Sequence, residues 1–83
     1  MPDVNAITAA IRDLTAARGP AKSICPSEVA RLLGGDDWRD LMPAVRDAAA
    51  ELSDAGDVRV TRGGKPVDPR NPGGPIRIQR VER

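Results

Sequence analysis

The sequence predicts a small α+β domain in which three helices are followed by a C-terminal β-hairpin. Apolar residues recur at helical spacing in the first two thirds of the chain, and glycine and proline interrupt that spacing. After Gly56, apolar and polar residues alternate instead. The 83 residues are enough for one domain, residues 1–83. Trp38 is the single aromatic residue, so the core has to be built from aliphatic side chains.

The first helix is predicted over residues 3–18, and a short extended segment over residues 21–24 follows it. Asp3 is a suitable N-cap, and Gly19 with Pro20 ends the helix. Its apolar residues recur at steps of three and four, as one helix face requires: Val4, Ile7, Ile11 and Leu14. We interpret the extended segment as a short strand, because prolines bound it on both sides.

The second helix is predicted to begin after Cys25. Pro26 suits the first helical position, where its missing N–H would be unpaired in any case. Glu28 stands at the spacing of a capping box, with Cys25 as a weak substitute for serine or threonine. Gly34 and Gly35 end this helix.

The third helix follows a tight turn. Asp36 or Asp37 is expected to cap it, and regular helix is expected from residues 39–41 to about Ala55. Pro43 is compatible with a helix only within the first turn. One stripe of apolar residues faces the core: Leu41, Val45, Ala48 and Leu52.

Residues 57–62 and 75–81 alternate between apolar and polar, which predicts the two strands of a hairpin. Residues 63–74 between them are rich in glycine and proline and are predicted to be a loop. Four residues are expected to face the core: Val58, Val60, Ile76 and Ile78. Four others are expected to share the outer face of the hairpin: Arg59, Thr61, Arg77 and Gln79.

This order of elements predicts a small winged helix-turn-helix domain. Helices two and three would form the helix-turn-helix, and the hairpin would form the wing. Ala30 and Gly34 fit that motif, because it needs a small residue where the helices meet and a glycine that accepts positive φ in the turn.

Four segments together resemble a small bacterial family catalogued as a domain of unknown function. They are residues 24–31 (ICPSEVAR), 38–46 (WRDLMPAVR), 64–69 (GKPVDP) and 74–77 (GPIR). The resemblance covers nearly the whole chain. It implies a winged-helix-like fold and a bacterial, cytoplasmic protein, and it implies no activity.

Residue composition argues against an enzyme. Histidine is absent and Cys25 is the one cysteine, so a zinc site and a Cys–His or Ser–His nucleophile pair lack their ligands or bases. We expect no catalytic residue, no cofactor and no metal. The sequence has no signal-peptide pattern and no apolar run long enough to span a membrane, so we expect a cytoplasmic protein without membrane contact.

The net charge of +1 conceals an asymmetry that favours an anionic partner. Residues 1–56 have a balance of −3, and residues 57–83 have a balance of +4. We expect duplex DNA to be bound through the wing and helix three, by Arg39, Arg46, Arg59, Arg62, Lys65, Arg70 and Arg77. The competing interpretation is a solvated surface, on which Asp36 and Asp37 cap helix three and pair with its arginines.

A second function remains open beside DNA binding, namely protein–protein contact through Trp38, Met42 and the hairpin. The chain is then expected to be a monomer or a weak dimer, because no additional dimerisation helix is visible. Trp38 can stack on a partner or fill the core. Cys25 can be a redox-active thiol at a helix N-terminus or a small buried residue.

Overall fold

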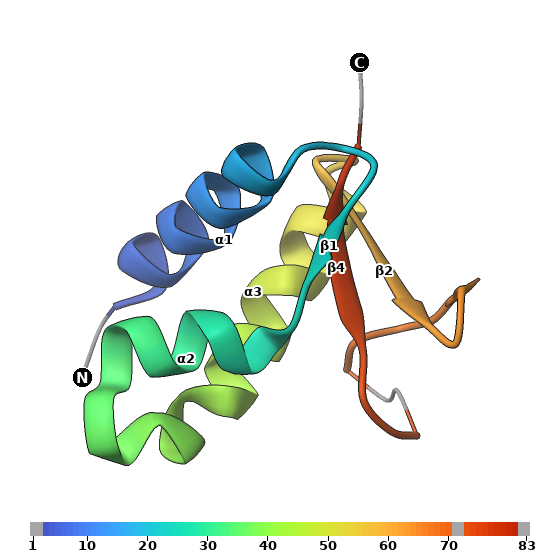
Figure 1. Ribbon diagram of the computed structural model, residues 1–83. Helices are drawn as coiled ribbons and strands as arrows, with labels where there is room; N and C mark the ends of the chain where they lie inside the picture. The colour runs from blue at the N-terminus through green and yellow to red at the C-terminus, as the bar shows by residue number, and fades with distance from the viewer. Residues whose placement is uncertain (1–2, 71–72, 82–83) are drawn as a thin grey trace.

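A computed structural model describes residues 3–70 and 73–81, and its helices cover one face of a small antiparallel sheet (Figure 1). The described residues form three α-helices and one 3-10 helix: α1 (Val4–Arg18), α2 (Pro26–Gly34), η1 (Gly35–Leu41) and α3 (Met42–Asp54). They also form four strands: β1 (Ser23–Ile24), β2 (Val58–Arg62), β3 (Lys65–Pro66) and β4 (Arg77–Arg80). The predicted mixed α+β composition is therefore confirmed.

The sheet has the strand order β1-β4-β2-β3, and every pair of neighbours is antiparallel. The short segment predicted to be extended forms β1, which pairs with β4. Ile24, Ile78 and Val60 stand side by side across β1, β4 and β2, and each is at most 2% exposed. This row of aliphatic side chains forms the sheet side of the core, against which the helices pack.

The core is aliphatic, as the composition requires. All four hairpin residues predicted to face the core are at most 4% exposed, and they pack with residues of all three α-helices. In α1, Ile7 and Ile11 are buried, and Asp3 caps the helix by accepting a hydrogen bond from the Ala6 N–H at 2.8 Å. Val4 is 60% exposed, so its predicted place on the buried face is wrong.

The connection between α2 and α3 differs from the predicted tight turn. It is η1, seven residues long, and α3 begins at Met42 rather than near residues 39–41. Pro43 stands in the first turn of α3, where it removes no helical hydrogen bond. The predicted caps are also wrong, because neither η1 nor α3 begins with a side-chain cap hydrogen bond, and so Asp36 and Asp37 do not fill that role.

Two adjacent glycines at this connection serve different purposes. Gly34 has a φ of −102° and is helical, so the predicted positive φ at this position is wrong. A Cβ atom on Gly34 would lie 2.7 Å from Cδ1 of Leu41, which is 2% exposed. The positive φ of 57° belongs to Gly35. Glycine is therefore needed for space at the first position and for backbone conformation at the second.

The hairpin is more elaborate than the two-stranded prediction. β2 pairs with β4 as predicted, and the segment predicted to be a loop contributes β3, which pairs with the other side of β2. Gly63 and Gly64 have φ angles of 60° and 83°, which suit a two-residue turn between twisted strands. Residues 71–72 of the predicted loop lie outside the described residues.

Candidate nucleic-acid interface

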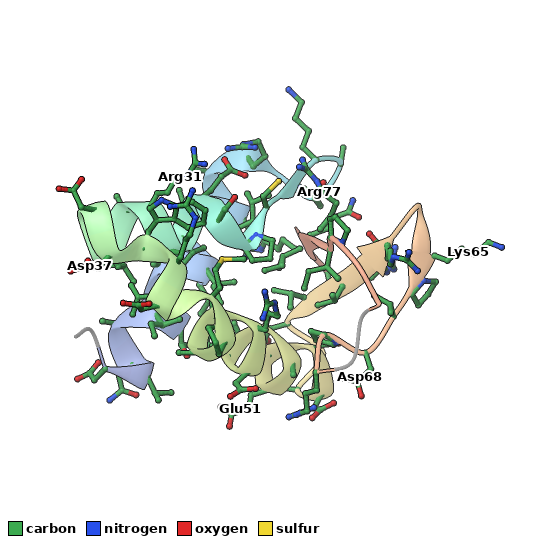
Figure 2. All side chains as sticks on the ribbon, turned by 90° about the horizontal axis from the view of Figure 1, so that it is seen from below. Arg31, Asp37, Glu51, Lys65, Asp68 and Arg77 are labelled. Carbon is green, nitrogen blue, oxygen red and sulfur yellow. The ribbon has the colours of Figure 1, made fainter. Side chains whose placement is uncertain are left out.

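The tip of the β2–β3 hairpin presents two cations to solvent. Arg62 and Lys65 are opposite each other in the register, on either side of the Gly63–Gly64 turn, and all four residues are exposed. Figure 2 shows Lys65 at the outer end of the hairpin, directed away from the helices. The glycines add no side chains, so the tip is a narrow ridge with one cation on each strand.

The outer face of the sheet carries the four residues predicted to share it. Arg59 is opposite Gln79, and Thr61 is opposite Arg77, while the neighbouring pair Val60 and Ile78 faces the core. Side chains directly opposite on antiparallel strands lie on the same face. The predicted outer face is therefore confirmed as a geometric arrangement.

Arg77 is tied to the neighbouring strand rather than free to reach a ligand. Its Nε donates to Ser23 Oγ at 2.9 Å, and its Nη2 donates to the Ser23 carbonyl at 3.1 Å. Its Nη1 donates to Cys25 Sγ at 2.6 Å. Gln79 is held in a similar way, because its amide donates to the Pro20 carbonyl. These bonds hold β4 against β1 and leave fewer N–H groups of Arg77 free to donate to a phosphate.

Two further candidate arginines are partly engaged within the protein. The Arg70 guanidinium is 3.5 Å from Asp54 Oδ2 at the end of α3. The Arg62 guanidinium lies against the backbone of Gly73 and Gly74, where a Cβ atom on Gly74 would be 2.7 Å from Arg62 Nε. Arg70 is thus ion-paired, whereas Arg62 packs on backbone and has no carboxylate partner among the described residues.

Trp38 and Arg39 lie together on η1. The Arg39 guanidinium carbon is 4.5 Å from the centre of the Trp38 ring, and that of Arg31 is 4.6 Å from it. Trp38 is half-buried and packs against the core. Its ring therefore fills space at the edge of the core and is not free to stack on a partner. Arg39 is exposed and belongs to η1, so it lies outside the helix on which it was predicted.

Arg46 is half-buried on α3 and lines a groove between the start of α2, α3 and the residues that precede β4. The other residues lining this groove are Cys25, Pro26, Ser27, Met42, Gly74, Pro75 and Ile76. Neither Arg46 nor Arg39 forms an ion pair with a carboxylate of the described residues. The predicted pairing of these two arginines with Asp36 and Asp37 is therefore absent among the described residues.

The solvent-facing side of α3 is acidic. Its exposed residues are Pro43, Asp47, Glu51 and Asp54. Their spacing of four, four and three places them on one stripe of the helix. Residues 36–54, which include most of η1 and all of α3, contain six acidic and two basic residues, a balance of −4. In Figure 2, Glu51 and Arg77 lie on opposite sides of the molecule.

Cys25 is half-buried at the start of α2, beside the Arg77 guanidinium. Its backbone N–H donates to Glu28 Oε2 at 2.7 Å, so the predicted Glu28 half of the capping box is present. The Arg18 guanidinium, which donates to Glu28 Oε1 at 2.7 Å, and the Cys25 N–H together lower the pKa of Glu28. This network orders the β1–α2 junction.

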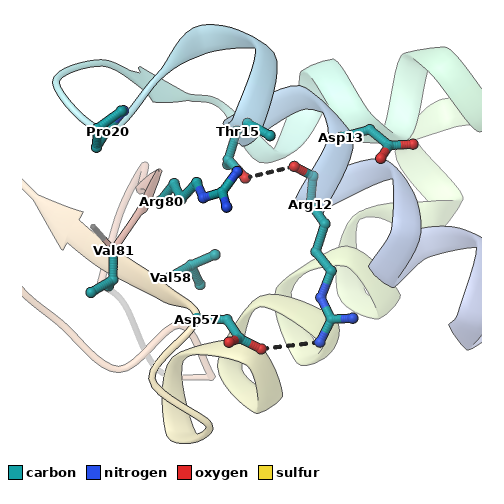
Figure 3. Close-up of a pocket in the computed structure, with 9 residues that line it drawn as sticks. Arg12, Asp13, Thr15, Pro20, Asp57, Val58, Arg80 and Val81 are labelled. Atoms are coloured by element: carbon teal, nitrogen blue, oxygen red, sulfur yellow. Dashed lines mark hydrogen bonds and ion pairs between the residues drawn. The ribbon is translucent and has the colours of Figure 1, made fainter. Parts of the chain in front are cut away.

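A second groove lies at the other end of the sheet, between α1, the start of β2 and the end of β4 (Figure 3). The Arg12 Nη2 of α1 is 3.0 Å from Asp57 Oδ2, and this ion pair closes one side. Arg80 lines the same groove near Thr15. Sequence reasoning missed the Arg12–Asp57 pair, because nothing in the local pattern relates residues 45 positions apart.

Six of the seven candidate cations form no ion pair with a carboxylate of the described residues, and Arg70 is the exception. Among residues 3–70 and 73–81, Arg77 instead donates hydrogen bonds to Ser23 and Cys25, and no ion pair involves Arg39, Arg46, Arg59, Arg62 or Lys65. Three of these five belong to the β2–β3 hairpin, with Arg59 and Arg62 on β2 and Lys65 on β3. The same residues contain no cluster of histidine, cysteine and carboxylate side chains suited to a metal ion. Their helices include none that is long and apolar enough to cross a membrane.

Comparison with known proteins identifies a family. A family model described as Protein of unknown function (DUF3253) matches residues 4–81, nearly the whole chain. This match confirms the resemblance to a domain of unknown function. No curated protein matches the chain.

Proposed function

We propose that this chain, which belongs to the family of proteins of unknown function DUF3253, is a winged helix-turn-helix module that binds duplex DNA through its basic hairpin. The order α1, β1, α2, α3, β2, β4 and the strand order β1-β4-β2 support the winged-helix assignment. In this description α2 and α3 are the two helices of the motif, and η1 replaces the tight turn between them. The β2–β3–β4 region is the wing.

The observation that carries the proposal is the unpaired charge of the hairpin. Arg59, Arg62 and Lys65 are exposed, and none has a carboxylate partner among the described residues. A cation already neutralised by a carboxylate gains little from a phosphate, whereas an unpaired one releases condensed counterions from DNA. The hairpin cations are therefore the strongest source of affinity for a polyanion.

A duplex fits this surface better than a single strand. Binding to single-stranded nucleic acid relies on aromatic side chains that stack on bases. Trp38 is the single aromatic residue, and it is half-buried with the guanidinium groups of Arg31 and Arg39 against its ring. The hairpin has no such platform, so phosphate contact is what it offers.

The test is a titration of the protein into a labelled random-sequence duplex, followed by fluorescence anisotropy between about 50 and about 200 mM salt. The double variant Arg59→Gln/Lys65→Gln should bind more weakly and show a salt slope shallower by up to about 1.8, because each lost phosphate contact contributes about 0.9. Lys22→Gln/Arg80→Gln removes the same charge at a distance from the hairpin tip, because Arg80 is opposite Val58 and lines the groove beside α1, and is the matched control. No anisotropy change for the parent protein at high micromolar concentration and low salt would exclude the proposal.

One observation favours the second function, protein–protein contact without DNA. Leu32 on α2 is 63% exposed, and α2 leads directly into η1, which carries Trp38. Trp38 and Met42 are half-buried against the core, so Leu32 is the more available apolar group. Sedimentation at increasing protein concentration tests self-association, which Leu32→Ser should weaken without altering the circular dichroism spectrum. If the parent protein stays strictly monomeric, a second copy of the chain is not the partner.

A further inference from the structure

We infer that α3 is turned away from the DNA and that the hairpin docks along the phosphate backbone, so binding is independent of base sequence. This inference rests on the proposed DNA binding and specifies its orientation. It starts from the opposite charges of two segments of the sequence, one that contains most of η1 and all of α3 and one that contains the hairpin. Residues 36–54 have a balance of −4, and residues 57–83 have a balance of +4.

The carboxylates exposed along α3 determine whether this helix can approach DNA. A helix that enters the major groove lies between two phosphate backbones and presents its exposed side chains to base edges. The exposed side of α3 would bring Asp47 and Glu51 into that groove, and neither is in an ion pair among the described residues. Because phosphate contact dominates affinity for DNA, unpaired carboxylates in this position oppose docking.

Arg46 does not offset the negative charge of these carboxylates on the exposed side of α3. It is half-buried in the groove that Met42 and Ile76 also line, beside the stripe rather than on it. Arg46 is four positions before Ala50, which is on the same side of α3 and 1% exposed. The cation on α3 therefore faces the residues that precede β4, and the carboxylates face solvent.

The hairpin offers charge and a narrow shape, and its cations could identify a base only by leaving the phosphates for a guanine edge. Arg59 lies on the outer face of the sheet, Lys65 lies at the tip, and the turn between the strands consists of Gly63 and Gly64. Sequence is read by side chains that donate or accept hydrogen bonds at base edges, and phosphate contacts carry no sequence information. A ridge of glycine flanked by flexible cations is thus suited to the backbone of any duplex.

The experiment neutralises each surface in turn at about 100 mM salt, where the Debye length is about 10 Å. The molecule measures 31 × 27 × 19 Å, so a charge on a side turned away from DNA is screened. Asp47→Asn/Glu51→Gln should change the Kd for a random-sequence duplex by less than about twofold. Arg59→Gln/Lys65→Gln should weaken the same binding by about tenfold or more. Asp54 is left unchanged because it pairs with Arg70.

Two outcomes overturn the inference while DNA binding itself stands. One is a gain in affinity of about tenfold or more in Asp47→Asn/Glu51→Gln, which would place α3 against the phosphates. The other is enrichment of a defined sequence when the parent protein selects from a random duplex pool. A parent protein that binds no duplex removes the proposed function and this inference together. The four substituted side chains are exposed, so circular dichroism should report an intact fold in both variants.

Discussion

The substitution Gly34→Ala sets a gain in helix propensity against a steric clash in the core. Gly34 has helical backbone angles, φ −102° and ψ −12°, and alanine is favoured over glycine in a helix interior by up to about 1 kcal/mol. Local propensity alone therefore predicts a more stable protein. The added Cβ would lie 2.7 Å from Leu41 Cδ1 and 3.4 Å from Leu41 Cγ. Leu41 is 2% exposed, so its side chain is enclosed by the core and would have to shift against its neighbours.

Overpacking of this kind costs about 1–3 kcal/mol, which exceeds the gain in propensity. We expect a net loss of about 1 kcal/mol and a fall in Tm of about 4–8 °C, measured by thermal denaturation followed by circular dichroism. Leu41→Ala removes the atoms that clash, at its own cost of about 2–5 kcal/mol. In that background, Gly34→Ala should be neutral or stabilising. A rise in Tm when Gly34→Ala is made in the parent protein would refute the reasoning.

Three further predictions concern the core, the turn and the response to acid. Ile78→Ala removes a 0% exposed side chain between Ile24 and Val60 and should cost about 2–5 kcal/mol, seen as a lower urea midpoint; an unchanged midpoint would contradict its central position. Gly64→Ala places a side chain at a φ of 83° and should cost about 1–2 kcal/mol in the same assay, while a neutral result would show that the turn can rearrange. The pKa of Glu28 is lowered below 4.5, first by the Arg18 guanidinium, so its carboxylate stabilises the fold above that pH and loses this effect as the pH falls through the folded-state pKa. Glu28→Gln should therefore lower Tm at pH 7 but not at pH 2, and an equal loss at both would show that charge is not the cause.

The candidate interface was only partly predictable from the chain. The outer face of the hairpin followed from alternation, because a strand period of two leaves no other arrangement once Val60 and Ile78 are buried. The bonds that Arg77 and Arg70 form within the protein could not be predicted in this way. Their partners Ser23 and Asp54 are 54 and 16 positions away in the sequence. A basic residue in the sequence is a candidate for binding, and only its neighbours in space determine whether its charge is available.

The sequence by itself determined the order of the three α-helices and of β1, β2 and β4, the capping roles of Asp3 and Glu28, and the aliphatic core. Each of these depends on residues close together in the chain or on a repeating period. Tertiary packing alone decided the length of η1, the reason for glycine at residue 34, and the pairing of β2 with two strands. It also placed the carboxylates of α3 toward solvent and its arginine toward the residues that precede β4. A helix has several faces, and only contact with the rest of the protein determines which face a ligand meets.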